Sequence, residues 1–373
     1  MEEKFATVLS EKSGEEAIKE ACFKLKFTFS GAIKYIFVFF TSHYQPETIL
    51  KTINFTLKPL GILGIQTPFL IFEEKIIEKG VVICCVNKKG VELKEFFIKS
   101  DESEHVESLL RTSLRDSPGE KFLFSFISHQ FNPFHYLKGV EMSLGRIFNV
   151  LGGGYVAKYG PKNYQIINNF IGEGLVNIIG KGLEVSSLRI GGFLPIGKPF
   201  TITKSLDKRG IIIEIDNQPA INIYKDYFEE KFDTFKKNHL FPLYPLGIEE
   251  NGGMHVISVV DHLEDGSLVC MGKIKEKKPI HLLLLQPSLL FESLKGVLEP
   301  FKKKEEGLVF IINSLVRKKI LKEHAQEEIK LIKHHLGNKF KIIGIYSDYS
   351  LFPNKEIQEI GLEAGSLLMT LWK

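Results

Sequence analysis

The sequence predicts an α+β fold in which mixed β-sheets are flanked by helices and the two halves of the chain repeat one another. The main observation is a repeated motif, since "ILGIQTPFLIF" at 62–72 resembles "IIGIYSDYSLF" at 342–352. Each copy closes a segment whose apolar periodicity reads helix, strand, helix, strand. Between the two segments, paired apolar runs around short Gly and Asp turns are typical of antiparallel hairpins. Sheets layered between helices follow from this pattern, and an αββα sandwich is one such arrangement.

The first segment starts with a helix and ends in the motif. A capping box of Ser13 and Glu16 predicts the start of that helix. The short aromatic run "YIFVFF" at 35–40 predicts a buried strand, and an apolar stripe from about Glu47 predicts the second helix. The motif itself is the second strand. After it, residues 81–98 read as a hairpin, because Asn and Gly separate two strand-like runs.

The second copy has the same order of elements. Pro287 lies near the start of a helix, 307–313 is a buried strand, and a further helix stops near Gly337 before the motif follows as a strand. Hairpins and additional helices are expected between the two copies. The hairpins are at 164–180, 199–216 and 255–274, and the helices are at 104–115, 133–146 and 218–238.

The composition is that of a folded protein of ordinary charge. Of the 373 residues, 44% are hydrophobic and 25% are charged, and the net charge is +4. Arginine, which reads phosphates and base edges, occurs only 6 times, so nucleic-acid binding is not expected. No apolar run reaches the ~20 residues of a membrane span, and the start lacks a secretory signal pattern. We therefore interpret the chain as a cytoplasmic protein whose 4 cysteines are reduced and mostly buried.

Few side chains are arranged for catalysis or metal binding. The sequence has no GxSxG, HExxH or Walker motif and no paired CxxC. His129 and His135 are close in sequence, but a turn separates them and no third ligand is evident, so no metal and no cofactor are expected. The glycine run at 151–160 is interpreted as a turn with positive φ rather than a phosphate cradle.

The polar residues that follow each Gly-Ile pair are the best candidates for a binding site. Gln66 and Thr67 follow the first pair, and Tyr346, Ser347 and Asp348 follow the second. A glycine at a strand end lets another backbone approach closely, and two related strand ends could face a common cleft. An equally weighted alternative is that Thr67 and Ser347 only cap the backbone of a tight turn.

A series of short motifs stands in order along nearly the whole chain: "YIFVFFTSHY", "GIQT", "GGGYVAKYG", "FLPIGKPFTIT", "EIDNQPAINIY", "LYPLGI", "DGSLVCMGKI", "GLVFIINSLVR" and "IIGIYSDYSLF". In this order they resemble the FIST family of sensory proteins. The resemblance implies a FIST N-terminal domain over 1–213 and a FIST C-terminal domain over 214–373. Two departures concern the site. The Gly-Glu pair that often follows each Gly-aliphatic motif is absent, and Ser314 replaces a cysteine that often precedes the equivalent of Arg317.

From this resemblance we expect a cytoplasmic, non-catalytic sensor that binds a small ligand, an amino acid or a similar polar metabolite, and signals through a partner protein. Arg317 is expected to hold a ligand carboxylate. Two alternatives stay open: a hydrolase or transferase that uses Asp216 or His262, and a scaffold without a ligand. Hydrogen bonds to the ligand are expected from Thr41, Ser42, Gln66, Thr67, Tyr346, Ser347 and Asp348.

Overall fold

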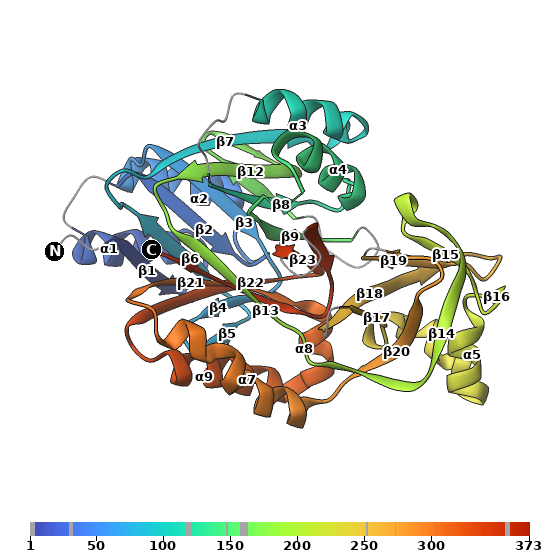
Figure 1. Cartoon of the computed structure of the whole chain (residues 1–373). Coiled ribbons are helices and arrows are strands. Elements are labelled where there is room, and N and C mark those ends of the chain that lie inside the picture. Colours follow the sequence, from blue (N-terminus) through green and yellow to red (C-terminus); the bar gives the residue numbers. More distant parts are fainter. Residues whose placement is uncertain are drawn as a thin grey trace.

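The part of the chain that the structure describes contains three six-stranded sheets and one seven-stranded sheet. Figure 1 shows the six-stranded sheets in the larger lobe at left and the seven-stranded sheet in a smaller lobe at right. The predicted α+β class, with mixed sheets flanked by helices, is confirmed. The structure is a computed structural model, and it describes residues 4–29, 33–115, 121–146, 148–156, 163–250, 253–272, 274–354 and 359–373.

The larger lobe consists of three repeats with one order of elements: strand, helix, strand, helical connection, strand, hairpin, strand. The first repeat comprises β1 (Phe5–Ser10), α1 (Gly14–Thr28), β2 (Tyr35–Phe40), α2 (Pro46–Leu57), β3 (Gly61–Gln66), β4 (Leu70–Phe72), β5 (Lys75–Ile77) and β6 (Val81–Val86). The second comprises β7 (Glu92–Lys99), α3 (Val106–Leu114), β8 (Phe122–Ile127), α4 (Pro133–Leu144), β9 (Val150–Gly154), β10 (Gln165–Ile167), β11 (Phe170–Gly172) and β12 (Gly174–Lys181). The third comprises β13 (Val185–Ile190), α7 (Pro287–Lys302), β21 (Gly307–Ser314), α8 (Leu315–Leu321), α9 (Ala325–Leu336), β22 (Phe340–Ser347), β23 (Tyr349–Asn354), β24 (Glu359–Glu363) and β25 (Leu367–Trp372).

The hairpin of each repeat pairs with a strand in the sheet of another repeat. The three strand orders are β1-β6-β2-β3-β10-β11, β7-β12-β8-β9-β23-β24 and β13-β25-β21-β22-β4-β5. The hairpin of the first repeat therefore completes the third sheet, that of the third completes the second, and that of the second completes the first. The central pair of each sheet is parallel, as a strand–helix–strand connection requires. This cyclic exchange ties the three repeats into one lobe.

The duplication visible in the sequence therefore extends to a third copy. The two Gly-Ile motifs belong to the first and third repeats. Each motif divides at its hydroxyl residue into two strands, β3 and β4 or β22 and β23, which lie in different sheets. In the second repeat the equivalent strand, β9, ends in three glycines instead of the Gly-Ile pattern. The repeated turn is thus the point at which each chain segment crosses to a neighbouring sheet.

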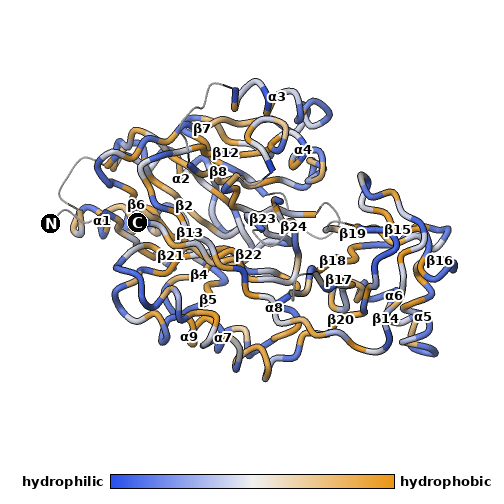
Figure 2. Tube along the Cα trace, viewed as in Figure 1, coloured by the Kyte–Doolittle hydropathy of each residue, from blue (hydrophilic) through white to orange (hydrophobic). Residues whose placement is uncertain are grey.

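The inner faces of the three sheets enclose one hydrophobic core. Phe37, Phe124 and Phe310 occupy equivalent positions on β2, β8 and β21, and their ring centroids lie 5.6, 6.1 and 6.3 Å from that of Trp372. Helices cover the outer faces, and Figure 2 shows hydrophobic residues concentrated along the strands. Burying aromatic rings of this size contributes strongly to folding, so this shared core is expected to hold the three repeats together.

The seven-stranded sheet is inserted into the third repeat, between β13 and α7. Its two short helices, α5 (Asn222–Phe228) and α6 (Phe232–Lys237), pack through stacked aromatic rings: the centroid of Tyr224 lies 5.4 Å from that of Phe235. The inserted sheet has the strand order β14 (Phe193–Leu206), β20 (Pro279–Leu285), β17 (Leu246–Glu250), β18 (Gly253–His262), β19 (Leu268–Met271), β15 (Ile211–Ile215) and β16 (Gln218–Pro219).

The predicted hairpin at 164–180 forms only over 165–172, where β10 pairs with β11, because β12 pairs with β7 and β8. Two further predicted elements are wrong. The hairpin at 81–98 does not form, because β6 lies between β1 and β2 while β7 pairs with β12. The single helix at 218–238 is interrupted instead: β16 takes its first two residues, and Glu229, with a φ of 44°, ends α5. A backbone with positive φ cannot continue a right-handed helix. Sequence periodicity alone does not reveal such an interruption.

Two predicted local features also differ. Ser13 does not cap α1, since its hydroxyl accepts a hydrogen bond from Lys79 and Glu16 pairs with Lys12. The glycine run is strand β9 up to Gly154 rather than a turn, and its last four residues, 157–160, lie outside the described residues. Among the helices of the described ranges, none has both the length and the apolarity needed to cross a membrane.

Candidate functional site

The ends of the two Gly-Ile strands meet. Thr67, directly after β3, donates a hydrogen bond from Oγ1 to the carbonyl oxygen of Tyr346 on β22 at 2.8 Å, and the amide of Tyr346 donates to the carbonyl oxygen of Phe69 at 3.1 Å. The two turns are alike: Thr67 Oγ1 lies 3.0 Å from Phe69 O, and Ser347 Oγ lies 2.8 Å from Tyr349 O. The repeated hydroxyl therefore holds the repeated turn.

The end of β9 joins the same place. Tyr155 donates its hydroxyl to the carbonyl oxygen of Tyr346 at 2.8 Å, and the amide of Asp348 donates to Gly154 O at 3.0 Å. The Asp348 carboxylate accepts a hydrogen bond from the amide of Val156 at 2.8 Å. One strand end from each repeat thus converges on what we call the strand-end junction. Ligands of sheets with parallel strands often bind outside the carboxyl ends of those strands.

The strand-end junction is closely packed. Thr67, Tyr346 and Ser347 are at most 1% exposed, and their turn hydroxyls are bonded to backbone carbonyls, as the turn-capping alternative expects. Burial of the Tyr346 hydroxyl raises its pKa well above the ordinary value. In this conformation a ligand would have to displace these internal bonds in order to reach the three residues. Their contact with a ligand stays a prediction.

The other predicted residues of the first repeat lie around its strand ends. Gln66 is buried, and its Oε1 accepts a hydrogen bond from the amide of Tyr164 at 3.0 Å. Thr41 is buried after β2, with Oγ1 3.3 Å from the amide of Gly80. Ser42 is exposed. The structure therefore places Gln66, Thr41 and Thr67 at the carboxyl ends of β2 and β3. The side-chain oxygens of Gln66 and Thr41 accept hydrogen bonds from backbone amides of the protein itself.

Arg317 does not face an open cleft. Its side chain is 0% exposed, and Nη2 lies 2.6 Å from Glu328 Oε1 in a buried ion pair. Nη1 donates to Gly191 O, and Asn313 Nδ2 donates to the second carboxylate oxygen of Glu328 at 3.1 Å. Arg317 Nη1 also donates to the backbone carbonyl oxygen of Gly365 at 3.4 Å. A ligand carboxylate could pair with Arg317 only by displacing Glu328, so the geometry favours a role in tying α9 to the ends of β13 and β24.

The three repeats fill equivalent positions differently. Arg317 lies three residues after Ser314 at the end of β21, and the same offset from Thr41 and Ser128, which directly follow β2 and β8, gives Tyr44 and Phe131. The side chain of Tyr44 reaches the carbonyl oxygen of Lys12 at 2.5 Å. Phe131 carries no polar group. In the second repeat, therefore, the side chain at this position is apolar. A cavity lies beside it.

A cavity of about 340 Å³ lies between the second repeat and the inserted sheet. We call it the Tyr349 cavity. Phe131, Tyr155 and Val156 line it from the turn after β8 and the end of β9, and Met271 lines it from β19. Its size is that of a small-ligand site, and it is bounded by two separate lobes, which is a common position for such sites.

Tyr349 lines this cavity, and its hydroxyl is a buried polar group. The residue is 1% exposed, and its hydroxyl has no hydrogen-bond partner among the described residues. Burial raises its pKa well above the ordinary value, so the phenol is neutral. A buried polar group without a partner costs about 1–3 kcal/mol. A ligand that bonded to this hydroxyl would recover that free energy.

Asp348 connects the cavity wall to the strand-end junction and titrates near neutral pH. Burial raises its pKa to about 6, although the hydrogen bond from Val156 opposes the shift. An unfolded Asp loses its proton near pH 4, so the folded state loses stability as the pH rises from about 4 to 6 and stays less stable above that range.

We therefore expect Asp348→Asn to be more stable than the wild type by roughly 2 kcal/mol at pH 7.5 and equal to it at pH 3.5. Asparagine keeps the oxygen that accepts from the Val156 amide but carries no charge. Urea unfolding at both pH values measures the difference. A constant difference across this pH range would show that Asp348 does not titrate with a raised pKa.

The residues of the enzymatic alternative are part of turns or of packing. Asp216 and Asn217, with φ of 50° and 59°, form the turn between β15 and β16, and Asp216 Oδ1 accepts from the amide of Thr201 at 2.8 Å. The His262 ring packs on Phe241, with centroids 5.4 Å apart. In the described ranges no group of three or more His, Cys, Asp or Glu side chains could hold a metal ion. The specific motif "IDNQPA" is thus a hairpin that docks on β14.

The sequence prediction missed the third strand end, where Tyr155 follows β9, and the neighbouring Tyr349 at the start of β23. A signal was present: "FTSHYQP" at 40–46 is similar to "ISHQFNP" at 127–133, and both end in the proline that begins α2 or α4. That similarity would have revealed the second repeat. No sequence pattern could show that the Tyr349 hydroxyl lacks a hydrogen-bond partner among the described residues, because this depends on which groups the fold places around it.

The model of the FIST N domain matches residues 34–218, and the model of the FIST C domain matches residues 220–348. The strand-end junction contains residues from both matched regions, since Thr67 and Tyr155 lie in the first and Tyr346 in the second. A search of curated proteins finds no match.

Proposed function

Since the chain belongs to the FIST family, whose domains are sensory domains of signal transduction, we propose that it is a cytoplasmic, non-catalytic sensor of a small ligand. The ligand binds in the Tyr349 cavity, and the signal passes to a partner protein. The observation that carries this proposal is Tyr349, which lines a cavity of about 340 Å³ and whose buried hydroxyl has no hydrogen-bond partner among the described residues.

The chemistry of the cavity favours a small carboxylate with an apolar part, such as an amino acid. Arg209 and His129 line the cavity together with the apolar side chains of Val260 and Met271, and Arg209 is exposed. A guanidinium at the rim suits a carboxylate, and the apolar wall suits a side chain. In this arrangement Arg209, rather than the buried Arg317, takes the role of carboxylate clamp.

Asp348 supports a route from the ligand to the junction. Its carboxylate holds the amide of Val156, which lines the cavity, and it is adjacent in the chain to both Ser347 and Tyr349. A ligand that bonds to Tyr349 changes the surroundings of this carboxylate. The predicted site residues of the junction then act as the part that responds to the ligand rather than the part that touches it.

Replacing Tyr349 with phenylalanine tests the site. A panel of amino acids and short carboxylic acids is screened by thermal shift, where a ligand at 100 times its dissociation constant adds ~2.7 kcal/mol of stability. In Tyr349→Phe we expect the ligand-induced shift to shrink by about 1 kcal/mol or more, while the ligand-free protein keeps or gains stability because an unsatisfied hydroxyl is removed.

Tyr44→Phe is the matched control. It removes a hydroxyl from another buried tyrosine, one that bonds to the carbonyl oxygen of Lys12. This variant should lose about 1 kcal/mol of stability and keep the full ligand shift. If no compound of the panel stabilises the protein, or if Tyr349→Phe keeps the whole shift, the ligand does not bind at the Tyr349 cavity.

A further inference from the structure

A second cavity adjoins the Tyr349 cavity. Its volume is about 330 Å³, close to the 340 Å³ of the first. Helix α4 and strand β24 line it on one side, and residues of the inserted sheet and its connections, among them His255 and Ile274, line it on the other. We call it the α4 cavity. Both cavities therefore lie at the boundary between the second repeat and the inserted sheet.

Phe134 alone among the described residues lines both cavities. Elsewhere along the boundary, residues that are close in sequence divide between the two. Met271 lines the Tyr349 cavity and Gly272 lines the α4 cavity, while Arg209 and Asp207 divide in the same way. The partition between the cavities is therefore thin, and the ring of Phe134 is the side chain that the two cavities share.

Gly210, directly before β15, leaves room for this ring. A Cβ atom at Gly210 would lie 2.8 Å from Cε2 of Phe134 and 3.0 Å from its Cζ. The φ of Gly210 is 67°, a left-handed conformation that favours glycine. The ring of Phe134 thus packs against bare backbone of the inserted sheet and spans the boundary between the two lobes.

The start of α4 fixes the position of Phe134. The side chain of Asn132 accepts a hydrogen bond from the Phe134 amide at 2.8 Å, and Pro133 is the first residue of the helix. Helix formation does not require an aromatic side chain here, because α2 also starts with a proline, Pro46, and Glu47 follows it. The place of the ring between the two cavities is therefore the better explanation for phenylalanine at this position.

We propose that Phe134 is the specificity-determining residue of the Tyr349 cavity, where it limits the length of the apolar part of the ligand. This rests on the proposed function, in which the ligand carboxylate lies near Arg209. Carboxylates of amino-acid size fit, and longer chains meet the ring. Each methylene that the cavity buries raises affinity roughly fourfold, whereas a methylene that meets a fixed ring adds nothing.

Phe134→Ala tests the partition, because it removes the ring and joins the two cavities. The probes are straight-chain carboxylates and their 2-amino derivatives with about four to about ten carbon atoms, and isothermal titration calorimetry measures their affinity for the full chain. For the wild type we expect affinity to rise with chain length up to a limiting length. In Phe134→Ala the rise should continue, so that the longest probes bind at least ~10 times more tightly than to the wild type.

Leu137→Ala is the matched control, because Leu137 lines the α4 cavity but not the Tyr349 cavity. This variant enlarges one cavity without joining the two, so it should keep the limiting length of the wild type. Phe134→Leu removes less of the side chain and should lengthen the limit by an intermediate amount. It provides the same test if the alanine variant does not fold.

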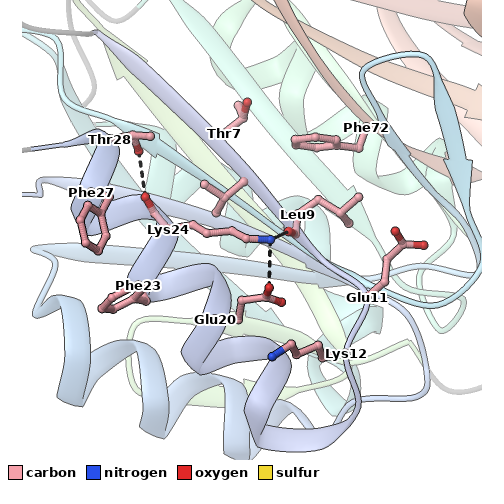
Figure 3. A pocket seen from close by; sticks show the side chains of 11 residues that line it. Thr7, Leu9, Glu11, Lys12, Glu20, Phe23, Lys24, Phe27, Thr28 and Phe72 are labelled. Atoms are coloured by element: carbon pink, nitrogen blue, oxygen red, sulfur yellow. Dashed lines mark hydrogen bonds and ion pairs between the residues drawn. The ribbon is translucent and has the colours of Figure 1, made fainter.

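A groove beside β1 is another place where an alkyl chain could bind. Figure 3 shows Phe23 and Phe27 on its helix wall, and their side chains are 62% and 77% exposed. Phe27→Ser removes the more exposed ring. Because this groove shares no lining residue with either cavity, the variant should leave the affinities and the limiting length unchanged.

Probes that bind with the same limiting length in Phe134→Ala and the wild type would overturn the role of Phe134 and leave the proposed function standing. So would the absence of a limit in the wild type, or a limit that Leu137→Ala or Phe27→Ser changes as much as Phe134→Ala does. If no probe binds the wild type or any variant, the proposed function fails, and the role of Phe134 fails with it.

Discussion

Arg317→Ala is expected to lower the free energy of unfolding by about 3–5 kcal/mol, because it leaves the carboxylate of Glu328 buried without its counter-charge. Both side chains of this pair are 0% exposed. Arg317 also bonds to backbone carbonyls at Gly191 and Gly365, which lie on separate strand connections. Its loss therefore leaves several buried acceptors unsatisfied at once, and urea unfolding of the variant measures the combined cost.

Two further variants separate charge from packing. Lys319→Ala, on the exposed face of the same helix α8, should change stability by less than ~0.5 kcal/mol. The double variant Arg317→Met, Glu328→Leu replaces the ion pair with apolar side chains of similar size and should recover most of the loss. If Arg317→Ala is as stable as the wild type, then Arg317 is free to serve a ligand, as the sequence prediction proposed.

Gly152→Ala is expected to destabilise the protein by roughly 3 kcal/mol or more, or to prevent its folding. A Cβ atom at this position would press on the backbone carbonyl of Ser125 on the adjacent strand β8. Because the obstacle is backbone, no side-chain rotation can relieve it. The parallel pair β8 and β9 would have to separate, and the strand-end junction depends on the end of β9.

Gly296→Ala is the control for this substitution. Gly296 lies inside α7, and a Cβ there meets no atom within 4 Å. Alanine is a better helix former than glycine, so this variant should gain about 0.5–1 kcal/mol. Urea unfolding of both variants gives the contrast. Equal effects at the two positions would mean that β8 and β9 are not in the tight register described here.

The sequence by itself determined the class of the fold and most of its elements. Apolar runs such as 35–40 and 307–313 predict buried strands correctly, because a strand covered on both faces needs apolar residues at consecutive positions. The repeated Gly-Ile motif correctly indicated a duplicated turn. The family resemblance is confirmed as well, since both FIST domains match the chain.

Only the tertiary structure decided how the repeats combine and what their polar groups do. The exchange of hairpins between sheets depends on long-range pairing, which leaves no local pattern: β3 and β4 are adjacent in the chain but lie in different sheets. The same holds for the site. A sequence shows that Arg317 and Tyr349 carry polar groups, but whether each group finds a partner depends on the surrounding fold. Glu328 forms an ion pair with Arg317 and accepts a hydrogen bond from its Nε, whereas the Tyr349 hydroxyl has no hydrogen-bond partner among the described residues.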